Sequence, residues 1–370
     1  MGNYQFTSES VCAGHPDKIC DQISDAIVDE VIRNDKNGRV AVETMVTKNR
    51  VIIVGEISTS AKIHIKRIAR EQIKRLGYND NSLHFTNKSP IEVYIQKQSN
   101  EIAIGVDNDG AGDQGLMFGY ACLDTDIFMP ISITIAHKLA YEIDKARETK
   151  ALPYLRPDGK TQVTVSYKNG VPDKVVSVIV AVPHSEDAKL DQVKDDIYKK
   201  IILPTLLKYN FTIDQNHVVI NGTGAWHIGG PSSDSGLTGR KIVVDTYGGY
   251  ARVGGGCFSG KDPTKVDRSG AYAARYIAKN IVAAKLAEKV EVSLAYFIGA
   301  KKPVMSEIET FGSEKKSKKI ISDFANGLLD TSVKGILQGL SLRRPLYLKT
   351  AAYGHFGREE FPWEKISKRI

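Results

Sequence analysis

Residues 254–268 read GGGCFSGKDPTKVDR, and this loop combines flexible backbone, two lysines and carboxylates. Glycines let main-chain N–H groups approach anionic oxygens, while Lys261 and Lys265 supply positive charge. A carboxylate such as that of Asp267 can hold a divalent metal ion. The stretch therefore predicts a polyphosphate site, against the alternative of a glycine-rich surface loop with solvated lysines.

The same stretch argues against the fold that its spacing first suggests. Gly255 to Lys261 follows the G-x-x-x-x-G-K pattern of a P-loop. However, Asp262 replaces the Ser or Thr whose hydroxyl would coordinate Mg²⁺, and Pro263 stands where the helix of a P-loop would begin. We therefore expect a phosphate site on another fold.

Outward from this loop, apolar periodicity and turn signals predict strand pairs and helices in each third of the chain. Helices are expected at 16–32, 61–76, 130–148, 188–207 and 269–288, and strands at 39–46, 51–58, 91–96, 162–167, 174–182, 241–247 and 291–298. Asn169-Gly170 predicts a hairpin turn, and the Gly- and Asp-rich residues 105–119 predict a mobile loop or linker. This order favours an α+β protein of three similar modules over a doubly wound parallel sheet.

Composition bounds the class of protein. The chain has 370 residues, 42% of them hydrophobic, which suggests two or three domains with substantial cores. Its apolar runs are too short to span a membrane, and residues 1–6 lack the apolar region of a signal peptide, so we expect a cytoplasmic protein. Four cysteines without C-x-x-C pairs predict reduced and mostly buried thiols: Cys12, Cys20, Cys122 and Cys257.

The formal net charge of +8 suits either nucleic acid or an anionic small substrate. The densest basic run, 314–319, has no interleaved aromatic residues, so nucleic-acid binding is the weaker alternative. The remaining cations occur in separated patches, and their separation suggests that they converge in the fold: Lys18, Lys160, Arg240, Lys241, Lys261 and Lys265.

Two carboxylates and a histidine lie beside the predicted phosphate-binding turns. Asp17 and Asp267 would suit a pair of Mg²⁺ ions that bridge phosphate oxygens, although each taken singly could be a helix cap or a surface residue. His15 precedes Pro16 at the positive end of the helix expected at 16–32. It could donate a hydrogen bond to a departing phosphate oxygen, or be a mere neighbour of the helix cap.

Glu43 and Glu56 are unusual because carboxylates are depleted in strands rich in Val and Ile. Each could simply face solvent. A semi-buried carboxylate would instead suit an ammonium group or a monovalent cation.

Six motifs together resemble the S-adenosylmethionine synthetases, also called methionine adenosyltransferases: residues 6–10, 14–18, 110–115, 239–241, 254–268 and 352–358. The resemblance extends to Trp363. It implies an α+β subunit of three similar βαβ-type modules with pseudo-threefold symmetry, with mixed sheets and helices on one face. The modules would cover 1–100, 101–228 with the mobile loop near 98–109, and 229–370 with the glycine-rich loop.

The resemblance also implies the reaction and the assembly. The thioether sulfur of L-methionine would attack C5′ of ATP and expel triphosphate, which is then hydrolysed to pyrophosphate and phosphate. A thioether has no proton to lose, so no general base is needed, and charge on the leaving group sets the barrier. Two Mg²⁺ per active site and K⁺ are implied, as is a homotetramer built as a dimer of dimers with active sites at the subunit interface. A phosphotransferase or ATPase that cleaves the terminal anhydride is the alternative, and a regulatory partner without activity is disfavoured because the catalytic positions are filled.

Roles follow from the resemblance position by position. The groups that would assist or hold the triphosphate are His15, Lys160, Arg240, Lys241, Lys261 and Lys265. Further contacts to ATP would come from Asp113, Asp158, Ala225, Trp226, Asp234 and Cys257. Methionine would be bound by Glu56, Gln98, Asp234 and Lys265. Mg²⁺ would be bound by Asp17 and Asp267, and K⁺ by Glu43.

Two stretches depart from the family pattern. The chain reads Gly224-Ala225-Trp226 where the family usually has Gly-Arg-Phe, which predicts weaker nucleotide affinity or a compensating lysine. The closing loop, 97–107, reaches the motif at 110–115 sooner than in bacterial relatives. A shorter lid would gate faster or seal the site less fully.

Overall fold

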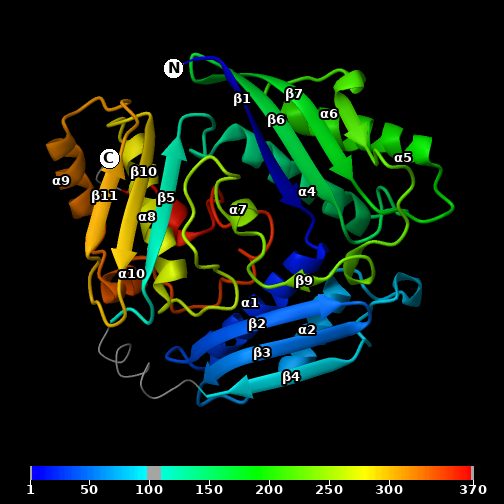
Figure 1. The fold of residues 1–370 in the computed structure, drawn as a ribbon, viewed down its shortest axis with the longest axis horizontal. Helices are drawn as coiled ribbons and strands as arrows, with labels where there is room; N and C mark the ends of the chain where they lie inside the picture. The colour runs from blue at the N-terminus through cyan, green and yellow to red at the C-terminus, as the bar shows by residue number, and fades with distance from the viewer. Residues whose placement is uncertain (1, 98–109, 368–370) are drawn as a thin grey trace.

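Three β-sheets with helices packed on one face make up the structure, a computed structural model that describes residues 2–97 and 110–367 (Figure 1). The elements confirm the expected α+β class, and the three similar layers of sheet and helix confirm the expected module architecture. No helix among these residues is long and apolar enough to cross a lipid bilayer.

The first sheet has the order β4-β3-β2-β9 and consists of β2 (Arg39–Thr47), β3 (Arg50–Ser58), β4 (Ile91–Gln96) and β9 (Gly236–Leu237). β3 and β4 are parallel and the other pairs antiparallel. Alternate residues of β2, such as Val40 and Val42, are buried beneath α1 (Pro16–Asn34), and α2 (Ile65–Arg75) packs on α1. The opposite face of this sheet carries exposed apolar side chains: Met45, Val54, Tyr94 and Leu237.

The second sheet has the order β1-β6-β7-β8, formed by β1 (Tyr4–Val11), β6 (Lys160–Lys168), β7 (Val171–Ala181) and β8 (Val218–Ile220). Asn169 and Gly170 both have positive φ and form the predicted turn between β6 and β7. α4 (Ile131–Glu148) packs on β1 and β6. The helix expected at 188–207 is a run of α5 (Leu190–Asp196), a π-helical turn (Ile197–Ile202) and α6 (Leu203–Leu207).

The third sheet, β11-β10-β5, is antiparallel throughout and contains β5 (Gly115–Cys122), β10 (Lys289–Tyr296) and β11 (Met305–Glu309). α8 (Val266–Ala283) crosses it at Gly119, where a Cβ would lie 2.0 Å from a main-chain atom of Ala274. α9 (Lys318–Leu328) and α10 (Val333–Gly339) complete this layer. Short helices lie elsewhere: α7 (Ile242–Asp245) and 3-10 turns at Asn81–Leu83, Gln215–His217, Gly230–Ser232 and Pro362–Glu364.

Each third of the chain lends one strand to the sheet of another third. β1 pairs with β6, β5 pairs with β10, and β9 pairs with β2 (Figure 1). The three layers therefore interlock around the segment that holds α7. This arrangement brings the start of α1, the loop after β9 and the loop before α8 to one region of the molecule.

Several sequence predictions about elements were wrong. Residues 241–247, expected as a strand, contain the helical turn α7, because Asp245 is fixed from outside by Lys18 and by the main chain of His355. β1 was missed because its buried face carries the polar Ser8 and Ser10, which bond to partners on α4. β5 begins inside the residues expected as a loop, α2 begins four residues late, and α8 covers 266–283 instead of 269–288.

Candidate active site

His15 caps the N-terminus of α1 and is almost fully buried, at 1% exposure. Its Nδ1 accepts a hydrogen bond from the main-chain N–H of Asp17 at 3.1 Å. Burial, together with the charge of the nearby Lys241, lowers the pKa of His15 to about 3. Because Nδ1 is an acceptor in a neutral ring, the proton lies on Nε2, which has no partner among the described residues. His15 thus presents a neutral N–H donor.

Asp17 connects α1 to the loop that follows β9. Its Oδ1 accepts the N–H of Leu237 at 2.9 Å, and its Oδ2 pairs with Lys241. The Nε of Arg240 lies 3.7 Å from Oδ1. Burial would raise the pKa of Asp17, but the bonds from Lys241 and from the Leu237 amide outweigh it and lower the pKa. The carboxylate is therefore ionised between two cations.

These residues form a first group, which we define as His15, Asp17, Lys160, Arg240 and Lys241. Lys160 belongs to it because its charge also lowers the pKa of His15. Lys160 and Arg240 are exposed, whereas Lys241 is largely covered. The group thus offers three cations and one neutral donor around a single carboxylate, which is the composition of an anion site.

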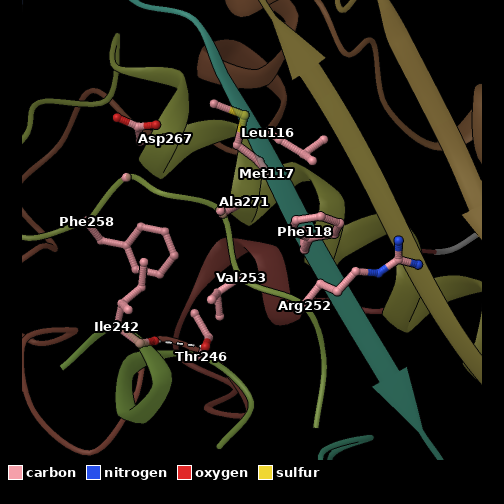
Figure 2. Close-up of a pocket in the computed structure, with 12 residues that line it drawn as sticks. Leu116, Met117, Phe118, Ile242, Thr246, Arg252, Val253, Phe258, Asp267 and Ala271 are labelled. Carbon is pink, nitrogen blue, oxygen red and sulfur yellow. Dashed lines mark hydrogen bonds between the residues drawn. The ribbon is translucent and has the colours of Figure 1, made fainter. Parts of the chain in front are cut away.

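The glycine-rich loop lies along β2. Gly260 accepts from the N–H of Val42 and Asp262 donates to the carbonyl of Val40, both at 3.0 Å. The Nζ of Lys261 bonds to the carboxylate of Asp267 in the first turn of α8. Figure 2 shows Asp267 beside Met117 of β5, at the edge of a small cavity between β5, this loop and α8.

The turn before α8 explains why the loop is not a P-loop. Asp262 Oδ1 accepts from the N–H of Thr264 at 2.9 Å and from its hydroxyl at 2.6 Å. This turn delays the helix until Val266, so no main-chain N–H cradle follows Lys261 directly. The ammonium of Lys265 pairs with Asp262 Oδ2 at 2.6 Å, so Lys265 is held by its own loop.

Glu43 and Glu56 lie diagonally on the exposed face of the first sheet, since Glu43 is opposite Val54 and Glu56 is opposite Ala41. Although solvent reaches Glu43, burial of its carboxylate raises its pKa; the charge of Lys261 opposes this and that of Glu56 adds to it. Cys257 is partly buried, and burial raises the pKa of its thiol. The charge of Lys261 opposes this rise, and those of Asp267 and Glu43 add to it. We define this second group as Glu43, Glu56, Cys257, Lys261 and Asp267.

Asp158 fixes two turns. Its Oδ1 accepts from Gly159 N–H at 2.7 Å and its Oδ2 from Gly230 N–H at 2.6 Å. Burial raises its pKa to about 6. Both oxygens of its carboxylate thus accept main-chain hydrogen bonds, and the residue lies two positions before Lys160 in sequence.

Trp226 is partly buried, and its Nε1 donates to the carbonyl of Ile228 at 2.8 Å. The other expected nucleotide contacts are exposed: Asp113, Ala225 and Asp234. Gln98 and the closing loop at 98–109 lie outside the described residues.

Lys18 was wrongly counted among the phosphate-binding cations. It is 1% exposed, and its Nζ lies 2.9 Å from Asp21 and 2.5 Å from Asp245. Burial would lower its pKa, but the two carboxylates raise it. Lys18 therefore has a structural role in the interior of the protein. Sequence reasoning also missed Asp21 and Asp25, which their four-residue spacing from Asp17 on a helix could have indicated.

The loops that carry the two groups adjoin, since a Cβ on Gly239, directly before Arg240, would lie 2.5 Å from Cβ of Cys257. Among the described residues, 2–97 together with 110–367, no hydrogen bond or ion pair joins a side chain of the first group to one of the second. The same residues contain no set of three or more His, Cys, Asp or Glu side chains that could hold a metal ion alone.

Family models match nearly the whole chain. They are described as S-adenosylmethionine synthetase, N-terminal domain, over residues 3–100, central domain over 108–226 and C-terminal domain over 228–365. Curated relatives named S-adenosylmethionine synthase include that of Clostridium tetani, 48% identical over 380 residues, which cover 98% of this chain and 97% of the relative. The relative from Mesoplasma florum is 48% identical over 368 residues (98% and 97%), and that from Staphylococcus epidermidis 50% over 382 residues (98% and 96%).

Proposed function

Since this chain belongs to the S-adenosylmethionine synthetase family and makes S-adenosyl-L-methionine from ATP and L-methionine, we propose that its two charged groups enclose the triphosphate of one ATP. The observation that carries this proposal is the composition of the groups. Each contains an aspartate, Asp17 or Asp267, whose carboxylate directly contacts a lysine, and the first adds the N–H donor of His15.

In the reaction a sulfur–carbon bond forms at C5′ while the bond from C5′ to the triphosphate oxygen breaks, and the electron pair leaves with that oxygen. The Nε2–H of His15 donates to the departing oxygen. Lys160, Arg240, Lys241 and Lys261 hold the phosphates and neutralise the charge that develops on them. A base is not needed, and a neutral His15 fits this role.

Mg²⁺ fits the two carboxylates. Mg²⁺ in proteins is commonly held by one or two carboxylates plus water and substrate phosphates, and Asp17 and Asp267 each supply one carboxylate beside a phosphate-binding lysine. We assign one ion to each residue, two per active site. When bound, they supply positive charge to the leaving triphosphate.

Glu43 fits K⁺, because its carboxylate is partly buried on the sheet surface with a second acid, Glu56, nearby. Glu56 binds the ammonium of methionine in this proposal, and Gln98, Asp234 and Lys265 contact other parts of methionine. Because Lys265 is paired with Asp262, it would have to exchange that partner to reach a substrate.

The nucleoside is bound by the remaining residues that the resemblance indicated: Asp113, Asp158, Ala225, Trp226, Asp234 and Cys257. The partly buried ring of Trp226 offers a face for the adenine, while Ala225 beside it supplies no charge. The chain divides into three modules that exchange strands: 1–100, 101–228 and 229–370.

A second copy of the chain completes the site. The exposed face of the first sheet carries apolar side chains at Met45, Val54 and Leu237, each 40% exposed, and at Tyr94, 61% exposed. Glu43 lies on this face, and Leu237 at its edge is bonded to Asp17. A partner that covers this face would bring the first group of one protomer to the second group of the other. We propose a cytoplasmic dimer of dimers built on this contact.

Incubation of the purified protein with ATP, methionine, Mg²⁺ and K⁺, followed by mass identification of every product, tests the reaction. The expected products are S-adenosylmethionine, pyrophosphate and phosphate. Formation of ADP would instead support cleavage of the terminal anhydride. Sedimentation measurements test the assembly, since a monomer with full activity would contradict a shared site.

A further inference from the structure

One face of α1 carries four aspartates at four-residue intervals: Asp17, Asp21, Asp25 and Asp29. Residues four apart lie above one another on a helix, so the four carboxylates form a row. All four are buried, at 7% exposure or less. Buried carboxylates need bonds to compensate for lost water, and each of these accepts from main-chain N–H groups of a distant segment: Asp17 and Asp21 from 237–239, Asp25 from Gly260, and Asp29 from 347–348.

The two middle aspartates hold the loops of the two charged groups. Asp21 Oδ1 accepts from Gly239 N–H at 2.8 Å, directly before Arg240 and Lys241. Asp25 Oδ1 accepts from Gly260 N–H at 2.9 Å, directly before Lys261. Both glycines have positive φ, a conformation that would strain the backbone of any residue with a side chain.

Buried cations fix these aspartates in turn. Arg268 makes two bonds to Asp25, at 2.7 and 2.8 Å, and also donates to the carbonyl of Lys261 at 3.0 Å. Lys18 pairs with Asp21. The carboxylates therefore cannot rotate freely, and the loops bonded to them are fixed in position relative to α1.

Asp29 is the internal comparison. It accepts from the N–H groups of Tyr347 and Leu348 at 2.9 and 3.0 Å, so it uses the same kind of bond from the same helix face. The segment it holds carries none of the residues assigned to the site. A purely structural aspartate on α1 should behave like Asp29.

We propose that Asp21 and Asp25 are positioning residues for adenosyl transfer, each dedicated to one charged group: Asp21 sets Arg240 and Lys241, and Asp25 sets Lys261. This inference rests on the proposed roles of those cations. If the two groups act in different active sites of a dimer, α1 links two sites through successive turns of one helix.

Steady-state kinetics of Asp21→Asn, Asp25→Asn and Asp29→Asn test the proposal. Asparagine keeps one acceptor oxygen but can turn its NH₂ group toward the loop amide. Because a displacement of about 1 Å can cost on the order of 100-fold, we expect kcat/KM for ATP to fall about 10- to 100-fold in the first two variants. Asp29→Asn should lose a comparable amount of thermal stability while its kcat/KM stays within about twofold of the native protein.

Equal kinetic losses in all three variants, or none in Asp21→Asn and Asp25→Asn, would overturn the proposal. If Asp25→Asn does not fold, Asp25→Glu replaces it, because glutamate keeps the charge opposite Arg268 but moves the acceptor oxygen by one methylene. The same expectation and the same refuting result then apply.

Hybrid oligomers with two affinity tags separate this proposal from the shared site on which it rests. A hybrid of Asp21→Asn and Asp25→Asn chains contains one site with both defects and one with neither, so about half of the native activity should return. A hybrid of Lys241→Ala and Lys261→Ala chains tests the shared site directly. Recovery only in the lysine hybrid would refute the dedicated roles of Asp21 and Asp25. Recovery in neither would refute the shared site, and the kinetics of the single variants would then decide the positioning role alone.

Discussion

Gly256→Ala is expected to damage the site by moving one carboxylate. A Cβ on Gly256 would lie 2.1 Å from Cγ of Asp267 and 2.2 Å from its Oδ1, whereas real Cβ contacts hardly ever fall below 3.0 Å. The carboxylate must therefore move by about 1 Å. Because Asp267 is in the first turn of α8 and partly exposed, its side chain can move without disturbing the core.

The magnitude follows from this displacement. A misplacement of about 1 Å at a reacting centre can cost on the order of 100-fold in rate, equivalent to about 2.7 kcal/mol of transition-state stabilisation. The same shift separates Asp267 from Lys261 and from the Mg²⁺ that we assign to it. We therefore expect kcat/KM to fall about 100-fold, and half-saturation to require more Mg²⁺ at fixed ATP.

Gly255→Ala is the matched control, because a Cβ at Gly255 meets no atom within 4 Å. Neither glycine has a positive φ, so alanine strains the backbone at neither position. The assay is initial-rate formation of S-adenosylmethionine across a Mg²⁺ titration, with thermal unfolding measured in parallel. Similar kcat/KM values for the two variants would refute the reasoning, and so would an activity loss that simply follows a lower melting temperature.

Further predictions concern the donor, the buried acid, the interface and the variant nucleotide contact. His15→Asn keeps a side chain that can cap α1 but removes the Nε2–H donor, so kcat should fall about 100- to 1000-fold with little change in melting temperature, and an unchanged kcat would contradict the assigned donor. The pKa of Asp158 is about 6 in the folded protein and about 3.9 in the unfolded chain, so the folded state binds more protons between these values and the stability from this group falls as pH rises. Between pH 5 and pH 7 the native protein should lose about 1 kcal/mol of unfolding free energy relative to Asp158→Asn, measured by urea denaturation; parallel pH profiles would count against it. Val54→Asp places a charge on the exposed apolar face and should yield inactive monomers in sedimentation experiments, whereas active dimers would exclude this face as the contact. Ala225→Arg should lower the KM for ATP, and an unaltered KM would show that the missing cation is irrelevant.

Elements with clear periodicity could be predicted from the sequence. α1 shows apolar residues every four positions, and β2 to β4 alternate or run apolar, so their bounds were expected within a few residues. The exchange of strands could not be predicted, because β9 has only two residues and owes its pairing with Met45 and Val46 to the sheet it joins. β5 begins in Gly- and Asp-rich sequence that reads locally as loop, and the pairing with β10 determines its conformation.

The site itself was predicted mainly by resemblance. Residues alone indicated that cations and carboxylates converge, but not which of them meet. The contact between Asp17 and Lys241 spans 224 positions of sequence, and only the pairing of β9 with β2 brings the two together. Lys265 and Asp262, by contrast, are only three positions apart, so their pairing could have been predicted from the sequence.

Lys18 and Lys261 show why residue type and local sequence do not decide a role at a phosphate site. Both lysines adjoin an aspartate in a motif near a predicted turn. Helix geometry places Asp21 one turn after Lys18, and Asp245 arrives from 227 positions away, so the ammonium is enclosed by two carboxylates. A buried ion pair is costly to break because the remaining charge loses its compensation, on the order of 3–5 kcal/mol. Lys18 therefore cannot leave its partners for a phosphate, whereas Lys261, one-fifth exposed beside a carboxylate that can also turn to a metal ion, can. The difference between a structural and a substrate-binding cation is thus set by the free energy of exchanging partners, which depends on burial and not on the identity of the residue.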